Sequence, residues 1–204
     1  SEEFANSKKA EKFERVSNLV SRAGDLKKAT LSGIADGSDT AASVRMMQLT
    51  GMRPGGDDDT QAKVKAYGAT TLLKSHVSVS GDTVSYNFTG KKGVTITNSV
   101  RDKALAGFVS ERLATDDGDR LFRTDAAKAN AFIKSSVGSD YKAKDLRTLK
   151  ANAMAGDLVS SAPRPSSQKD LIAAKNRVGD AVSAQLGNTR AVALKDYIDP
   201  QVFA

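Results

Sequence analysis

The 204-residue sequence contains no cysteine and only one histidine, His76. Without cysteine, disulfides, thiolate metal sites and cysteine nucleophiles are excluded. A single histidine cannot build a zinc-protease helix or any other multi-histidine metal site. No apolar run approaches the ~20 residues of a membrane span, and no signal peptide opens the sequence. These absences favour a soluble, cytoplasmic chain without a membrane partner.

Acidic residues are fewer than basic residues. Lys and Arg total 31 against 24 for Asp and Glu, which gives a formal net charge of +7, and the sequence pI is about 9.5. An excess of this size favours polyanionic partners, although it says nothing about the fold. At roughly 150 residues per domain, the length predicts one domain with a sizeable core.

The first part of the chain is predicted to be helical. The first helix is expected to end near Gly24, a second covers residues 26–35, and a third follows the turn at residues 36–39 and ends near Gly51. Residues 53–59 are rich in Gly, Pro and Asp, which predicts a loop. The apolar stripe of the first helix consists of Phe13, Val16, Leu19 and Val20.

A period of two then replaces the helical period, which predicts a three-stranded antiparallel meander. The pair Gly81-Asp82 suits a two-residue hairpin turn, and Lys91 and Lys92 lie at the next reversal. The alternating apolar residues are Val77, Val79, Val84, Tyr86, Phe88, Val94 and Ile96.

Helical spacing returns for the rest of the chain. Asp125 is expected to cap one helix, residues 163–167 to link two others, and Gly187 to stop the last before a short tail over residues 189–204. The predicted fold class is α+β: a mostly α-helical domain with one small three-stranded antiparallel sheet. Its four later stripes are Leu105, Phe108, Val109 and Leu113; Ala129, Phe132 and Ile133; Leu146, Leu149 and Ala153; and Leu171, Val178, Val182 and Leu186.

Several site types are absent from the sequence. It has no Gly-rich phosphate loop, no dinucleotide fingerprint and no Gly-x-Ser-x-Gly elbow. The run of aspartates at residues 57–59 is interpreted as a solvated loop, because a metal site needs ligands that converge from several elements. His76 stands beside a predicted strand and is interpreted as a structural or surface residue. We therefore expect neither a metal nor a cofactor.

Four segments carry basic residues and a tyrosine in a distinctive order. They are residues 50–55 (TGMRPG), 88–93 (FTGKKG), 144–151 (KDLRTLKA) and 186–189 (LGNT), with Tyr197 nine residues beyond Asn188. In this order they resemble the catalytic domain of type IB DNA topoisomerases of the poxviral and bacterial branch, which is related to the tyrosine recombinases. The stretch YGATTLLK at residues 67–74 is similar to one that leads into that family's sheet. The resemblance runs from about Val44 to Phe203.

The resemblance implies a role for each residue. Arg53 and Arg147 would stabilise the charge of a pentacoordinate phosphate, for which the planar guanidinium is suited. Lys91 would protonate the leaving 5′-oxygen, Lys144 would assist that transfer, and Tyr197 would form a 3′-phosphotyrosyl link. The further residues implied to contact DNA are Lys92, Tyr67, Thr71, Lys74, Thr148 and Lys150.

Two features depart from the family pattern. Asn188 stands where the poxviral enzymes have histidine, and an amide can donate a hydrogen bond to phosphate but cannot move a proton. The family's small β-rich N-terminal clamp domain has no counterpart in residues 1–204, which divide into N-terminal helices (1–43) and a catalytic core (44–204). We therefore expect weak DNA binding.

The sequence thus predicts a monomeric domain that breaks and rejoins double-stranded DNA and relaxes supercoils without ATP or metal. Its DNA would be that of a bacterial nucleoid, a virus or a phage. Two alternatives stay open: a tyrosine recombinase or integrase catalytic domain, and a non-catalytic DNA-binding module of the same fold. Against the recombinase, Arg147 is followed by Thr-Leu-Lys, where recombinases usually have a histidine and then an aromatic residue.

Overall fold

The computed structural model describes residues 2–204, which are mostly helical. The longer helices are α1 (Glu2–Val20), α2 (Ala23–Ala35), α3 (Asp39–Thr50), α5 (Lys103–Leu113), α6 (Ala126–Val137), α7 (Ala143–Ser160) and α8 (Gln168–Leu186). The short helical turns are α4 (Asp57–Gln61), η1 (Ala69–Thr71), η2 (Lys74–His76), η3 (Lys91–Gly93), α9 (Arg190–Val192), η4 (Ala193–Tyr197) and η5 (Pro200–Phe203). Strands β1 (Val77–Ser80), β2 (Thr83–Thr89) and β3 (Thr95–Arg101) form one antiparallel sheet in that order, which confirms the α+β prediction. Within residues 2–204, no helix combines the length and apolarity that a membrane crossing requires.

Helix α3 ends where the sequence predicts. The Ser38 hydroxyl accepts a hydrogen bond from the Ala41 amide (3.1 Å) and caps the start of the helix. Gly51 ends it in the left-handed conformation, with a φ of 71°. A Cβ atom at this position would lie 2.7 Å from Leu186 Cδ2, so Gly51 also permits close packing against the end of α8.

The predicted boundary at Gly24 is wrong. Helix α1 ends at Val20, and Gly24 lies inside α2. Glycine is favoured at helix C-termini because it adopts a positive φ, and Gly24 is not among the glycines with positive φ.

The sheet has the predicted meander topology. Val84 of β2 lies opposite Val79 of β1, and Phe88 lies opposite Ile96 of β3. The predicted alternation fails only at Val94, which precedes β3 and is 37% exposed because η3 turns the chain before the strand begins. The β2–β3 connection is formed by η3 and carries Lys91 and Lys92, both of which are exposed.

Two segments predicted without helix contain helical turns. Residues 57–59 begin α4, where their carboxylates interact favourably with the helix dipole. In the tail, the Thr189 hydroxyl accepts a hydrogen bond from the Val192 amide (3.2 Å), and Pro200 opens η5. Composition did not predict these turns, because each is only three to five residues long.

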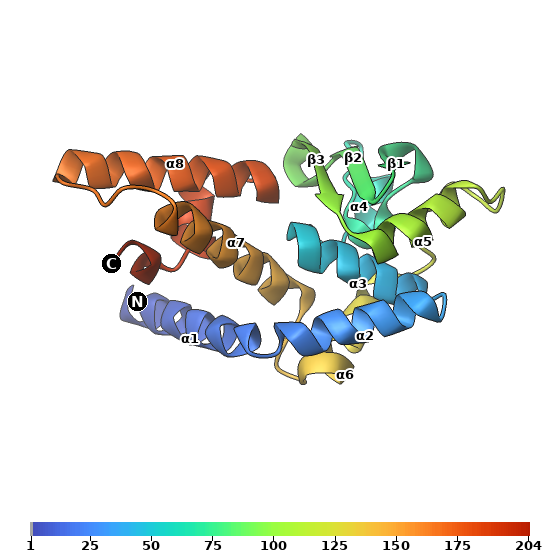
Figure 1. Ribbon diagram of the computed structural model, residues 1–204, viewed down its shortest axis with the longest axis horizontal. Coiled ribbons are helices and arrows are strands. Elements are labelled where there is room, and N and C mark those ends of the chain that lie inside the picture. Colours follow the sequence, from blue (N-terminus) through green and yellow to red (C-terminus); the bar gives the residue numbers. More distant parts are fainter. Residues whose placement is uncertain (1) are drawn as a thin grey trace.

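The buried apolar residues divide into two clusters. The main cluster lies between the sheet and helices α1–α3 and α5–α7, and its largest members include Phe122, Met46 and Met47. The second cluster joins the C-terminal half of α7 to α8 and the C-terminal turns. Its members are Ala151, Ala155, Val178, Val182, Leu186, Ala193, Tyr197 and Ile198. Helix α7 runs diagonally from the first region to the second, and both chain ends lie near the second (Figure 1).

Candidate active site

Five of the six residues predicted to catalyse DNA cleavage line one cavity of about 500 Å³. These five are Arg53, Lys91, Lys144, Arg147 and Tyr197. They come from distant parts of the chain: the loop after α3, the turn η3, the first turns of α7, and η4. With Lys142, the wall carries five cationic side chains against one carboxylate, Asp59. The cavity is therefore suited to an anion.

Arg147 is the most constrained of these groups, at 2% exposed. Its Nη1 donates to the Gly51 carbonyl (2.7 Å), its Nη2 to the Leu186 carbonyl (3.1 Å), and its Nε to the Tyr197 hydroxyl (3.4 Å). Burial, and then repulsion by Arg53, lowers the pKa of Arg147. A guanidinium nevertheless stays protonated in proteins, so this side chain is a fixed positive charge beside the tyrosine.

Tyr197 is held by an unusual backbone turn. Residues 193–197 form a π-helical turn, closed by a hydrogen bond from the Ile198 amide to the Ala193 carbonyl (2.9 Å). Such turns are rare and frequently occur at functional sites. Asn152 of α7 donates to the Tyr197 carbonyl (2.9 Å) and accepts from the Asp199 amide (2.7 Å). The chain is thus fastened to α7 at Tyr197 itself and two residues after it.

The electrostatic surroundings favour the Tyr197 phenolate. Burial by itself raises the pKa of this phenol, but Arg147, Arg53 and Lys12 outweigh it and lower the pKa below its ordinary value. Opposite charges close to an acid stabilise its ionised form. The phenol is therefore easier to deprotonate than a free tyrosine.

The loop carrying Arg53 rests on the segment that follows α4. The Ala69 amide donates to the Arg53 carbonyl and the Thr70 amide to the Pro54 carbonyl, both at 2.7 Å. A Cβ atom on Gly68 would lie 2.5 Å from the Arg53 carbonyl oxygen, so only glycine allows this approach. Residues 67–71 therefore position Arg53.

Lys91 lies on the exposed turn between β2 and β3. Its neighbour Lys92 has a φ of 63°, a rare conformation for a residue other than glycine. Gly90 donates to the Val94 carbonyl (2.7 Å) and closes the turn. Lys91 reaches the cavity wall, whereas Lys92 does not.

Asn188, the sixth predicted catalytic residue, does not line the cavity. It follows the C-terminus of α8, two residues after the carbonyl that accepts from Arg147. Its side-chain Oδ1 and Nδ2 are buried and form no hydrogen bond within the described part of the chain.

The residues predicted to contact DNA lie in different surroundings. Tyr67 lines the cavity and packs edge-on against His76, with ring centroids 4.5 Å apart. Lys74 is paired with Asp117 (2.9 Å). Thr71 and Thr148 are buried, with 1% and 0% of their surface exposed. Lys92 is exposed and Lys150 is half-buried.

Sequence reasoning missed Lys12 of α1, whose ammonium lies 5.0 Å from the centre of the Tyr197 ring. It shares a helix face with Val16 and Leu19, which are buried. That spacing could have shown that Lys12 faces the protein, but not which residue it meets.

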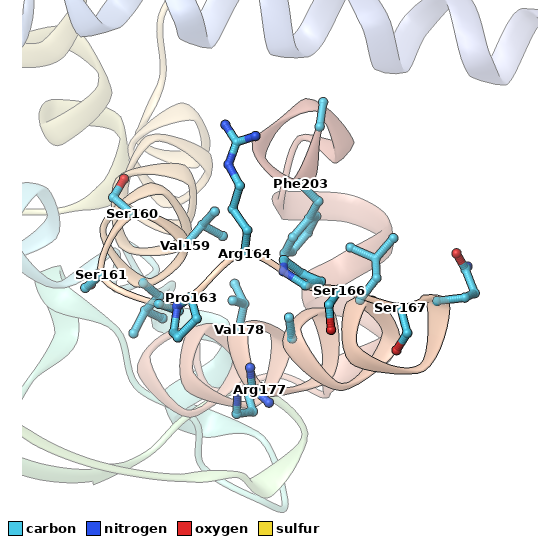
Figure 2. Close-up of a pocket in the computed structure, with 17 residues that line it drawn as sticks. Val159, Ser160, Ser161, Pro163, Arg164, Ser166, Ser167, Arg177, Val178 and Phe203 are labelled. Atoms are coloured by element: carbon cyan, nitrogen blue, oxygen red, sulfur yellow. The ribbon is translucent and has the colours of Figure 1, made fainter.

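A larger cavity lies elsewhere. It measures about 910 Å³ and is bordered by the α7–α8 linker, α8 and Phe203 (Figure 2). None of the predicted site residues lines it. Its two arginines, Arg164 and Arg177, point in different directions (Figure 2). Among residues 2–204, no group of three or more His, Cys, Asp or Glu side chains is placed to hold a metal ion.

Comparisons with known proteins identify the family of this chain. Residues 1–202 match the family model described as eukaryotic DNA topoisomerase I, catalytic core. DNA topoisomerase 1B of Acanthamoeba polyphaga mimivirus is 29% identical over 150 residues, covering 66% of this chain and 45% of the viral protein.

The fold also has solved counterparts. The XerH site-specific recombinase bound to difH substrate, in a pre-cleavage complex, matches with a TM-score of 0.53 at 14% identity, covering 87% of this chain and 50% of the recombinase. The chain thus spans half or less of the length of both relatives. Because the family model extends over nearly the whole chain, the protein belongs to the family of the eukaryotic DNA topoisomerase I catalytic core.

Proposed function

We propose that this domain cleaves and rejoins one strand of double-stranded DNA through a covalent bond to Tyr197, and thereby relaxes supercoils. The observation that carries the proposal is the convergence of Tyr197, Arg147, Arg53 and Lys91 on one cationic cavity. The family membership and the viral topoisomerase support the same reaction.

The cleavage step uses the chain's own groups. The Tyr197 oxygen loses its proton to solvent and forms a bond to phosphorus, while the bond from phosphorus to the 5′-oxygen breaks. The Lys91 ammonium gives a proton to that oxygen, which leaves as a hydroxyl. Strand rotation followed by the reverse attack restores the phosphodiester and the protein.

Arg53 and Arg147 act on the charge that develops in the transition state. Preorganised donors stabilise such charge more than water does, because they need no reorganisation during the reaction. The three buried hydrogen bonds of Arg147 fix its direction beforehand. Since the phosphotyrosyl bond conserves the energy of the broken bond, resealing requires no ATP.

DNA affinity should come mainly from phosphates. The net charge of +7 suits a backbone-directed interaction, which carries little sequence information. The logarithm of the affinity should fall linearly with the logarithm of salt, by about 0.9 for each phosphate contact. We propose that the domain acts as a monomer on DNA in the cytoplasm.

The test is covalent trapping on a nicked duplex, read on a denaturing gel, together with relaxation of a supercoiled plasmid. The wild type should give an adduct, and Tyr197→Phe should give none while binding the duplex normally. Tyr86→Phe removes a buried hydroxyl outside the cavity and serves as the matched control. An adduct in Tyr197→Phe would mean that another residue attacks, and relaxation without any adduct would reject the mechanism.

A further inference from the structure

Helix α1 places a charged side chain, Lys12, in contact with the turn that carries Tyr197. Lys12 donates a hydrogen bond to the carbonyl oxygen of Asp196, the residue before Tyr197. Its ammonium lies 5.0 Å from the centre of the Tyr197 ring, within the range of a cation–π contact. On the same ring, the Arg147 guanidinium lies 5.2 Å from the centre. The tyrosine is thus in contact with two cations from different helices.

Helix α1 is also fastened to the other side of the cavity. One turn after Lys12, Arg15 forms an ion pair with Asp145 of α7 (2.8 Å). Asp145 accepts a hydrogen bond from the Lys142 amide (2.9 Å) and is 4% exposed, so it is a rigid anchor. Lys142, Lys144 and Arg147 of the cavity wall belong to this same stretch of chain. Successive turns of α1 therefore tie the Tyr197 turn to the start of α7.

We propose that Lys12 is a positioning residue for the nucleophile: it fixes the turn that carries Tyr197 and adds a cation beside the phenol. This inference rests on the function proposed above. It explains why this half-buried lysine of α1 lies against the Tyr197 ring.

The charged groups that face Lys12 are consistent with this role. Asp196 and Tyr197 face it from the C-terminal turn, and Lys144 and Asp145 face it from α7. Burial lowers the pKa of the Lys12 ammonium, and the anions around it oppose that effect. Lys12 in turn is one of the cations that lower the pKa of Tyr197.

The experiment compares Lys12→Ala, Lys12→Met and Lys12→Arg with the wild type and with Lys8→Ala. Lys8 is an exposed lysine one turn earlier on the same helix, so its variant removes the same charge away from the cavity. The rate of covalent cleavage is measured in a single turnover with saturating protein, as a function of pH. The phenol of Tyr197 is titrated separately by ultraviolet difference absorbance against Tyr197→Phe.

Lys12→Ala and Lys12→Met should cleave about 10-fold more slowly near neutral pH, the scale of a partly desolvated cation–π contact. Their rate should rise at a higher pH than the wild type's, and the Tyr197 phenol should titrate at a higher pH. Lys12→Arg should restore most of the rate, and Lys8→Ala should match the wild type. Met retains the apolar stem, so a loss in both Ala and Met reports on the charge.

Lys12→Ala and Lys12→Met variants with the rate, pH profile and phenol titration of Lys8→Ala would overturn the inference. A slower rate without any shift in either pH profile, and without rescue by Lys12→Arg, would reduce Lys12 to an ordinary structural contact and also overturn it. If the wild type itself forms no adduct, the proposed function fails, whereas the phenol titration still decides whether Lys12 acts on Tyr197.

Discussion

The two hydrophobic clusters differ in the size of their side chains and in what they hold. The main cluster contains Phe122, Leu72 and Met46, and it supports the loop of Arg53 and the turn of Lys91. In the second cluster, three of the eight members are alanines. Because buried alanine removes less apolar surface from water than larger side chains do, the second cluster contributes less stability per residue. Arg53 and Lys91 are therefore supported by the region that buries the larger side chains, and Tyr197 is supported by the other region.

The comparison indicates which side chains position the Tyr197 oxygen relative to the cationic groups of the cavity. Local opening is easiest where few large side chains are buried, yet attack requires the tyrosine oxygen to be placed within a fraction of an ångström. Arg147 lies on α7 at the border of the two clusters and bonds to a carbonyl on each side. We infer that this side chain, with Asn152 and Lys12, aligns the two regions.

The strongest way to break this alignment is Arg147→Ala. Cleavage should fall by about 100- to 1,000-fold, the cost of removing one preorganised donor. Amide exchange of residues 190–200 should accelerate, because the tie between α3 and α8 is lost. Single-turnover cleavage and exchange mass spectrometry measure the two effects.

Arg147→Lys serves as the control for charge. A lysine keeps the charge but not the fork that contacts Gly51, Leu186 and Tyr197 together. It should therefore recover little activity. Full recovery would show that charge alone matters.

Lys91→Ala should leave the alignment intact and affect only the chemistry. Cleavage should slow by about 100-fold or more, in line with general-acid contributions. In a substrate with sulfur at the 5′-bridging position, the 5′-thiolate is a better leaving group than the 5′-oxygen. This substrate should therefore restore the rate. Lys103→Ala removes an exposed lysine that lies outside the cavity and outside the predicted DNA contacts, and it serves as the control. Sulfur rescue of Arg53→Ala but not of Lys91→Ala would mean that the roles are misassigned.

Gly187→Ala tests a contact between the two regions. Gly187 has a φ of 69°, and a Cβ there would lie 2.6 Å from Ile96 Cδ1 of β3. The substitution should lower the free energy of unfolding by more than ~1 kcal/mol, since alanine is strained at positive φ. Gly156→Ala, in the interior of α7 with no atom within 4 Å of the new Cβ, should instead raise it by ~0.5–1 kcal/mol. Equal effects in urea unfolding would contradict the close packing of α8 on the sheet.

His76→Gln should have the smallest effect. The Leu73 amide donates to His76 Nδ1 (3.0 Å), and burial lowers the pKa of the imidazole. The stability that His76 contributes is therefore present above its unfolded pKa of about 6.5, and it is lost as the pH falls through the lower folded value. Wild-type protein should lose more stability than His76→Gln between about pH 7.5 and 5, while their cleavage rates agree at neutral pH. A large cleavage defect would give His76 a catalytic role.

Local signals in the sequence predicted most of the fold correctly. The turn before α3, the hairpin at Gly81 and the stop at Gly187 each depend on a few neighbouring residues, and all three are confirmed. The prediction that the site residues share one cavity rested on the order of the motifs and the family that they resemble. No local sequence rule brings Arg53 close to Tyr197. The π-helical turn and the contact from Lys12 depend on packing between segments far apart in the chain, which periodicity does not report.

Some properties of the site residues also had a local sequence signal, whereas others depend on tertiary contacts. The alternation of the strands placed Lys91 at the reversal between the second and third strands, as observed. The pairing of Lys74 with Asp117 and the burial of Thr148 had no sequence signal, because both arise from tertiary contacts. Direct DNA contacts by these two residues stay predictions.

The measurement that tests the central claim most directly is peptide mapping of the covalent adduct. Two tyrosines, Tyr67 and Tyr197, line the same cavity, one supported by each cluster. Trypsin separates them, because cleavage after Lys65 and Lys74 releases residues 66–74, and cleavage after Lys195 releases residues 196–204. Mass spectrometry should find the nucleotide on residues 196–204 alone. A nucleotide on residues 66–74, or on any peptide without Tyr197, would contradict the assignment of the nucleophile to the second cluster.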